Sequence, residues 1–429
     1  MKLAINGGKP LREKLFPAYN TIGKNEKRLV KKVMKSGNLS QYLGAWSDDF
    51  YGGPTVKKLE EKWCEVFKIN HSISVNSNTS GLFAAIGAIG VKPGDEVIVT
   101  PYSMSASALA PLIYGGIPIF ADIDPNNYCL DPKSIEEKIT PRTKAILVVH
   151  LFGHPADMKS IMDIAKRHNL KVIEDCAQCP LGMHENRLLG TIGDIGIFSL
   201  NYHKHIHCGE GGVIVTNNPD LAERCQMIRN HAENIVGPKG IKDLTNLLGF
   251  NYRMTEINCA IAIAQLDKLP KLVEKRIENV QFIADKLEHF PAFDLLPEIE
   301  KGSINTYYFH PIKYNSKNAE GIHRNKFIEA LKAEIPSAKL RETAPLISSG
   351  YVKPLYLLPV FQQKAAWAFN EKLYDRELDY SVGICPVTEQ MHNDILFTHE
   401  YMRPSNSRKD MIDFVNAIDK IFSNISELK

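Results

Sequence analysis

The feature that most constrains the fold is an alternation of short apolar runs with amphipathic stretches between residues 55 and 235. The apolar runs are short, rich in Val and Ile, and lack strict polar alternation, which is typical of strands buried on both faces. This order predicts an α/β layer with a mostly parallel sheet. The expected strands are 96–100, 117–121, 145–149, 171–174, 195–199 and 212–215, and the expected helices are 79–89, 105–114, 158–168 and 219–230.

The pattern changes near residue 265. Beyond it we expect a long helix over 266–287, which Pro270 could kink or interrupt. A strand over 306–312, helices over 324–333 and 409–423, and an irregular, proline-rich segment over 335–365 complete this part. A chain of 429 residues is longer than one core usually serves. We therefore expect an N-terminal arm with one helix over 1–50, a large α/β domain over 51–265 and a smaller C-terminal α+β domain over 266–429.

Composition excludes several classes of protein. Lys and Arg number 52 against 49 Asp and Glu, so charge favours no nucleic acid as the main partner. No apolar run approaches the roughly 20 residues of a membrane span, and the N-terminus lacks the apolar run of a secretory signal. We therefore expect a cytoplasmic protein with no membrane partner, whose eight cysteines are reduced thiols rather than a disulfide framework.

Three polar residues mark the expected ligand edge of the sheet. Asp175 closes one predicted strand, Ser199 ends the next, and Lys204 follows five residues later. Ligands of parallel sheets bind beyond the carboxyl ends of the strands. An anion and an amine at this edge suit pyridoxal 5′-phosphate (PLP), because the anion keeps the pyridine nitrogen protonated and the amine forms a Schiff base with the aldehyde.

A phosphate site is predicted beside these residues. The polar cluster at residues 76–81 leads into the expected helix 79–89, whose N-terminus offers unbonded N–H groups and the positive end of the helix dipole. The hydroxyl of Ser199 could hold another phosphate oxygen. Each feature alone is commonplace, since such clusters usually serve only as helix caps and a lone lysine is usually solvated. Their joint order and spacing are much more specific.

Together the motifs resemble the DegT/DnrJ/EryC1/StrS family of sugar aminotransferases, which have the PLP-dependent transferase fold type I of aspartate aminotransferase. The resemblance extends over nearly the whole chain. The segments that carry it are INGGKP at 5–10, SNTSGL at 77–82, PGDEVIV at 93–99, EDCAQ at 174–178, FS at 198–199, Lys204 with GEGG at 209–212, GFNYRM at 249–254 and CPVTE at 385–389.

The resemblance implies a role for each matching residue. Lys204 would be the Schiff-base lysine and Asp175 the partner of the pyridinium nitrogen, so these two are the expected catalytic residues. Gln178 would lie near the ring hydroxyl, and Asn251 would reach the phosphate of the neighbouring subunit, which makes the active unit a homodimer with shared sites. The cofactor-binding residues implied in this way are Asn78, Thr79, Met104, Asp175, Gln178, Ser199, Lys204 and Asn251.

Two positions depart from the family pattern. Met104 stands where the family usually has an aromatic residue stacked on the PLP ring, and a thioether can also pack on a π face. Asn78 replaces a glycine that commonly precedes the threonine, and Asn tolerates unusual backbone angles better than most residues.

Histidines and cysteines near the cofactor motif raise the question of a metal. His203, His205 and His207 alternate beside Cys208, but three ligands from so short a run rarely close the tetrahedron that zinc requires. No metal site is predicted, and contact of one of these histidines with substrate is favoured. The C-x-x-C at 176–179 resembles a redox motif, yet its place inside the cofactor motif favours small residues packed around PLP.

The predicted function is transfer of an amino group from glutamate or glutamine to a keto sugar, nucleotide-linked or phosphorylated, or to a keto-cyclitol. A sugar dehydratase of the same family would carry His at the position of Lys204, and a non-catalytic regulatory protein would have no need of the intact Asp175, Ser199 and Lys204 set. The acceptor stays open, because no concentrated basic patch demands a diphosphate. The candidate substrate contacts are His203, His205, Arg253 and Tyr308.

Overall fold

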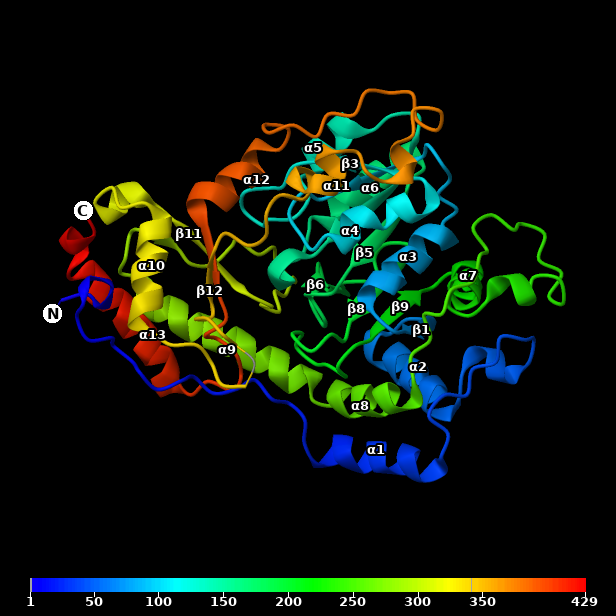
Figure 1. The fold of residues 1–429 in the computed structure, drawn as a ribbon, viewed down its shortest axis with the longest axis horizontal. Helices are drawn as coiled ribbons and strands as arrows, with labels where there is room; N and C mark the ends of the chain where they lie inside the picture. The colour runs from blue at the N-terminus through cyan, green and yellow to red at the C-terminus, as the bar shows by residue number, and fades with distance from the viewer. Residues whose placement is uncertain (1, 341) are drawn as a thin grey trace.

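The computed structural model describes residues 2–340 and 342–429. Over these residues, the centre of the fold is a seven-stranded sheet in the order β1-β9-β8-β5-β4-β2-β3 (Figure 1). The strands from β3 to β8 run parallel, and β9 is antiparallel to both β8 and β1, so the mostly parallel sheet is confirmed. The strands are β1 (His71–Val75), β2 (Glu96–Val99), β3 (Ile117–Phe120), β4 (Thr143–Val149), β5 (Lys171–Asp175), β8 (Ile195–Ser199) and β9 (Gly212–Thr216).

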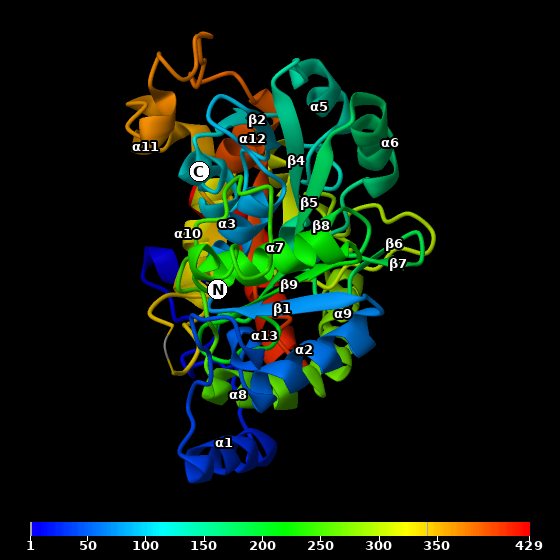
Figure 2. The ribbon, with the colours of Figure 1, turned by 90° about the vertical axis from the view of Figure 1, so that its right-hand side faces the viewer.

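Helices flank this sheet, and α2 and α7 lie on opposite sides of β1 (Figure 2). The expected helix 105–114 is divided into α4 (Ala106–Leu109) and a 3₁₀ turn, because Pro111 begins a new turn. The N-terminal helix α1 (Lys24–Ser36) packs against α8. The other helices of this part are α2 (Pro54–Phe67), α3 (Asn78–Ala88), α5 (Pro132–Lys138), α6 (Met158–His168), α7 (Pro219–Arg229) and α8 (Glu256–Leu266).

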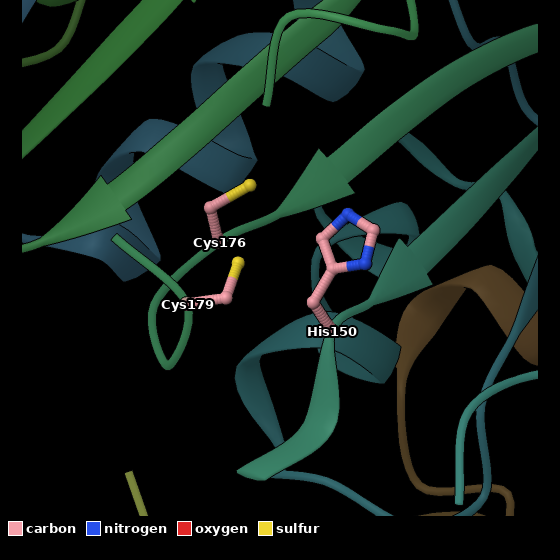
Figure 3. Close-up of side chains that lie close together, drawn as sticks. All are labelled: His150, Cys176 and Cys179. Carbon is pink, nitrogen blue, oxygen red and sulfur yellow. The ribbon is translucent and has the colours of Figure 1, made fainter. Parts of the chain in front are cut away.

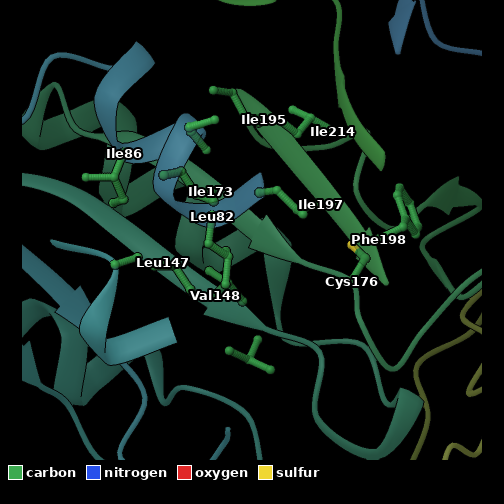
Figure 4. Packing of buried hydrophobic residues seen from close by; sticks show 14 of the residues in the cluster. Leu82, Ile86, Leu147, Val148, Ile173, Cys176, Ile195, Ile197, Phe198 and Ile214 are labelled. Carbon is green, nitrogen blue, oxygen red and sulfur yellow. The ribbon is translucent and has the colours of Figure 1, made fainter. Parts of the chain in front are cut away.

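Helix α3 lies close against the sheet and begins at the ligand edge. Its buried face, which includes Leu82 and Ile86, packs on apolar side chains of β5, β8 and β9 (Figure 4). Gly81 permits this approach, since a Cβ there would lie 2.7 Å from a methyl carbon of Ile197. The Ser77 hydroxyl caps the helix by accepting the N–H of Ser80. The N-terminus of α3 is thereby held beside the carboxyl ends of β5 and β8.

The C-terminal part contains an antiparallel sheet in the order β10-β11-β13-β12. The expected helix 266–287 is interrupted just before Pro270, since Leu266 ends α8 and α9 begins at Leu269. Pro270 stands in the first turn of α9, where proline is tolerated, and α9 itself is unbroken. The expected strand 306–312 begins only at His310, since Tyr307 has a φ of 50°. The elements are α9 (Leu269–Leu287), β10 (Phe293–Asp294), β11 (His310–Tyr314), α10 (Arg324–Glu334), β12 (Ile347–Ser349), α11 (Pro359–Gln362), α12 (Pro386–Gln390), β13 (Leu396–His399) and α13 (Arg408–Phe422), with the hairpin β6 (Met183–His184) and β7 (Arg187–Leu188) from the large part.

Buried apolar side chains of the described residues form two clusters. The larger extends from residue 42 to residue 273 and takes in 355–396, whereas the smaller joins Leu3 and Phe16 to residues 280–347 and 397–428. The segment 355–396 therefore packs on the sheet of the large part, although it follows the small part in sequence. The division into 1–50, 51–265 and 266–429 stays our proposal for the domains.

No helix among the described residues combines the length and the apolar character that crossing a membrane would require.

Candidate active site

A cavity of about 500 Å³ lies at the carboxyl ends of β5 and β8 and the N-terminus of α3. It brings together most of the residues expected from the sequence. Tyr351, Ser103 and Glu210 also line it. The expected residues in its wall are Asn78, Thr79, Met104, Asp175, Gln178, Ser199, His203, Lys204 and Tyr308.

Asp175 is held through both carboxylate oxygens. Its Oδ1 accepts the backbone N–H of Ala177 at 3.1 Å and the Nδ2 of Asn78 at 3.3 Å, and its Oδ2 accepts the Ser107 hydroxyl at 2.9 Å. Burial raises the pKa of Asp175, and these hydrogen bonds oppose the rise. The result is an oriented carboxylate, the group that a pyridinium nitrogen requires.

Lys204 is a buried amine at the same edge. Burial lowers its pKa to about 8, and the negative charge of Asp175 limits the fall. Its Nζ lies 4.2 Å from the centre of the Tyr308 ring. About one tenth of the amine is therefore unprotonated at pH 7, far more than for an exposed lysine, which suits attack on an aldehyde.

The start of α3 offers donors for a phosphate. Gly212 of β9 approaches so closely that a Cβ would lie 2.7 Å from the carbonyl carbon of Ser77, so the glycine of the GEGG segment lets strand and helix N-terminus meet. Ser199 and Thr79 line the cavity here. The side chain of Asn78, expected at the phosphate, donates to Asp175 instead, and its buried Oδ1 has no hydrogen-bond partner. A buried carboxylate, a buried amine and a helix N-terminus together fit the ring nitrogen, aldehyde and phosphate of PLP.

Gln178 is oriented by two contacts. Its Oε1 accepts the N–H of Phe152 at 2.8 Å, and its Nε2 donates to the Tyr351 hydroxyl at 3.2 Å. The amide therefore lies in a fixed position on the cavity wall.

Three expected residues lie outside this wall. His205 is buried, and its Nε2–H donates to the carbonyl of Thr306 at 2.9 Å. Asn251 is exposed and accepts the Nε–H of Arg253 at 2.8 Å. Arg253 also donates to the Oδ1 of Asn230 at 3.3 Å. The tertiary structure thus directs His205 away from the cavity and places Asn251 and Arg253 together on a separate surface.

Sequence reasoning missed two contributors. Ser107, in the expected helix 105–114, carries no local signal that its hydroxyl meets Asp175. Tyr351 lies in the segment predicted to be irregular and reaches the cavity because that segment folds back onto the large part.

His150, Cys176 and Cys179 meet beyond the ends of β4 and β5 (Figure 3). The Nδ1 of His150 accepts the N–H of Ala156 at 3.1 Å, so its Nε2 carries the proton that it donates to Glu174 at 3.0 Å. Neither nitrogen keeps a lone pair for a metal ion. Burial raises the pKa of both thiols, which keeps them protonated.

The chain matches the DegT/DnrJ/EryC1/StrS aminotransferase family over residues 20–403. It belongs to this family. The enzyme is therefore a PLP-dependent aminotransferase, as the sequence predicts, and its fold is type I of the PLP-dependent enzymes.

Similar proteins cover essentially the whole chain. L-glutamine:2-deoxy-scyllo-inosose aminotransferase of Micromonospora echinospora is 28% identical over 436 residues, covering 100% of this chain and 99% of that protein. The aminotransferase of Psychrobacter cryohalolentis has a TM-score of 0.81 at 27% identity, covering 96% and 100% of the two chains. S. venezuelae DesV, solved with a ketimine intermediate, has a TM-score of 0.76 at 26% identity, covering 92% and 94%.

Proposed function

We propose that this enzyme transfers the amino group of glutamine to a keto-cyclitol, with PLP bound through Lys204. The observation that carries the proposal is the buried pair of Asp175 and Lys204 facing one cavity. PLP, when bound, supplies the aldehyde that takes up the amino group and the electron-poor ring that stabilises a carbanion.

Each side chain of the site has a task in this proposal. Asp175 keeps the ring nitrogen protonated, since a buried carboxylate stabilises an adjacent positive charge. With PLP bound, the Lys204 amine would hold and move the proton at the reacting carbon. Gln178 would lie near the hydroxyl of the PLP ring and orient it, and Ser199 with the first turn of α3 would hold the phosphate.

The charge of the cavity wall supports the choice of substrates. Among the described lining residues, Lys204 is the only Lys or Arg, and Glu210 supplies a negative charge besides Asp175, which pairs with the ring nitrogen in this proposal. Such a wall disfavours a donor with a second carboxylate, and its described residues offer no Lys or Arg besides Lys204 for a diphosphate. Glutamine and an uncharged keto-cyclitol fit better than glutamate and a nucleotide sugar. The similarity to an L-glutamine:2-deoxy-scyllo-inosose aminotransferase supports the same two substrates.

We further propose that the active unit is a homodimer in which Asn251 completes the phosphate site of the neighbouring subunit. Asn251 is exposed, lies outside its own cavity wall and is oriented by Arg253. Leu244 and Leu248, shortly before it in the chain, are also exposed, which is typical of a surface that a second copy covers. The cytoplasmic location stays a prediction.

A two-stage experiment tests the substrates. The cofactor-loaded enzyme is first mixed with L-glutamine or L-glutamate, and loss of the visible absorbance band is followed. The aminated form is then offered 2-deoxy-scyllo-inosose, a nucleotide-linked keto sugar or a simple 2-keto acid, and return of the band is measured. We expect glutamine and the inosose to react fastest. Faster reaction of glutamate or of the nucleotide sugar would contradict the substrate assignment, and return of the band with 2-keto acids alone would indicate an ordinary amino-acid transaminase.

A further inference from the structure

Arg276 of α9 is fully buried, and no ion pair joins it to a carboxylate among the described residues. Its Nη1 donates to the carbonyl oxygens of Tyr307 and Tyr308 at 3.1 and 3.2 Å, while its Nε and Nη2 are buried without hydrogen-bond partners. Burying a charge without a counter-ion is unfavourable, and an apolar side chain often replaces buried charges without loss of stability. The Tyr19 ring, whose centre lies 5.1 Å from the guanidinium carbon, offsets part of this cost. The two carbonyls that the guanidinium holds give a further reason for an arginine here.

The two carbonyls that Arg276 binds belong to a strained turn. Tyr307 has a φ of 50°, a left-handed conformation that is unfavourable for a bulky side chain. The N–H of Tyr308 donates to the carbonyl of Phe152 at 2.7 Å, so the turn is held from the large part of the chain as well. These contacts determine the direction of the Tyr308 ring, which lies 4.2 Å from the Nζ of Lys204.

The Tyr308 ring presents its face to the Lys204 amine. An aromatic face attracts a cation, so the ring stabilises the protonated amine while burial disfavours it. The other ionisable groups whose charge acts on Lys204 are Asp175, Glu400 and Cys179. Moving the ring would therefore change both the direction of the amine and its readiness to lose a proton.

We propose that Arg276 is a positioning residue that acts on Lys204 through the Tyr307–Tyr308 turn, by holding the Tyr308 ring against the amine. A guanidinium suits this task because its N–H groups have fixed directions, whereas an ammonium group lacks that geometry. The inference rests on the proposed function, in which Lys204 is the amine that takes up PLP.

The test follows the rate at which added PLP forms the visible band on the full-length, cofactor-free chain as a function of pH. Only the unprotonated amine reacts, so the midpoint of this profile reports the pKa of Lys204. We expect a wild-type midpoint near 8. Tyr308→Phe keeps the ring and should leave the midpoint unchanged. Tyr308→Leu keeps an apolar cover without the π face and should lower the midpoint by about half a unit to one unit.

Two variants of Arg276 separate positioning from charge. Arg276→Lys keeps the positive charge but loses the two fixed N–H directions of Nη1, and Arg276→Met loses both. If Arg276 acts by holding Tyr308, both variants lower the midpoint as Tyr308→Leu does, and Arg276→Lys adds nothing further in the Tyr308→Leu background. If Arg276 acts only by its charge, Arg276→Met raises the midpoint and Arg276→Lys leaves it unchanged.

Several results would overturn the inference. An unchanged midpoint in Tyr308→Leu excludes a role for the ring, and this result overturns the inference even where the buried Arg276 variants fail to fold. A full Arg276→Lys effect in the Tyr308→Leu background excludes action through the ring. If the wild-type chain forms no band that Lys204→Ala abolishes, the cofactor assignment itself is wrong and the inference falls with it. If wild type behaves as expected and only the variants do not, the inference alone fails.

Discussion

Asp175→Asn separates the charge of this side chain from its shape. The carboxylate accepts three donors, from Asn78, Ala177 and Ser107. An amide placed with its oxygen toward Asn78 and Ala177 keeps both of those hydrogen bonds, and the Ser107 hydroxyl can rotate to accept from the amide nitrogen. We therefore expect the cavity to keep its geometry and the variant to unfold near the wild-type temperature.

The loss should instead appear in the cofactor and the reaction. Removing one partner of a buried charge pair costs about 3–5 kcal/mol. Because this cavity is open to solvent, we take the lower value of about 3 kcal/mol. At about 1.4 kcal/mol per factor of ten, this free energy corresponds to a loss of a hundredfold or more. We expect a loss of this size divided between PLP affinity and the single-turnover rate with glutamine. The assays are titration of the visible band, stopped-flow absorbance and thermal unfolding.

Ser107→Ala is the matched control, because it leaves the charge of Asp175 and removes one hydrogen bond to it. A hydrogen bond to a charged group contributes about 1.5–3 kcal/mol, so a loss of about tenfold is expected at the lower end of that range. The reasoning would be refuted if Asp175→Asn bound PLP and turned over within threefold of wild type. It would also fail if Ser107→Ala were the more damaging change.

Three further predictions follow from other parts of the structure. Lys204→Ala should abolish the visible band and turnover while thermal unfolding is unchanged, and near-wild-type turnover would remove Lys204 from the site. An equal mixture of Lys204→Ala and Asn251→Ala subunits should regain about one quarter of wild-type activity, because about half of the dimers are then mixed and each mixed dimer rebuilds one of its two sites, whereas shared sites are excluded if nothing is regained. Burial lowers the pKa of His310 to about 4 and that of His399, 2.9 Å away, well below its usual range. Both folded-state pKa values lie below the unfolded value of about 6.5. The contribution of the two neutral imidazoles to the free energy of unfolding is therefore fully present above that pH and is lost as pH falls toward 4. Urea unfolding gives the free energy of unfolding at pH 7.5 and at pH 5.0. We expect the difference between these two values to be about 2 kcal/mol smaller in His310→Gln than in wild type, and equal differences would contradict this.

The sequence predicts the sheet better than the irregular segments. Its six expected strands agree with the structure to within two residues, because buried Val and Ile runs are a local signal. Strand β1 was missed, since Ser72 and Ser74 interrupt its apolar run and its place depends on pairing with the distant β9. Within 335–365, β12 and α11 were missed because both are short and their partners are remote in sequence.

The sequence also predicts which side chains reach the ligand edge. Residues that follow parallel strands gather at one edge whatever the loops do, so Asp175, Ser199 and Lys204 could be assigned together. Their partners could not, because Ser107 lies 68 residues before Asp175 and meets it only through packing. Asn78, which directs its side chain to Asp175, illustrates the same limit.

The sequence by itself therefore determined the alternation of strands and helices in the large part of the chain and the edge at which the chemistry takes place. Both follow from periodicity and from the direction of parallel strands, which are properties of short segments. Only the tertiary structure decided the environment of each group: that Lys204 is buried against Tyr308, that His205 faces Thr306, and that Asn251 is left for a neighbouring subunit's site in our proposal. Burial, hydrogen bonding and charge at one atom depend on segments far apart in the chain, and these meet only when the whole chain has folded.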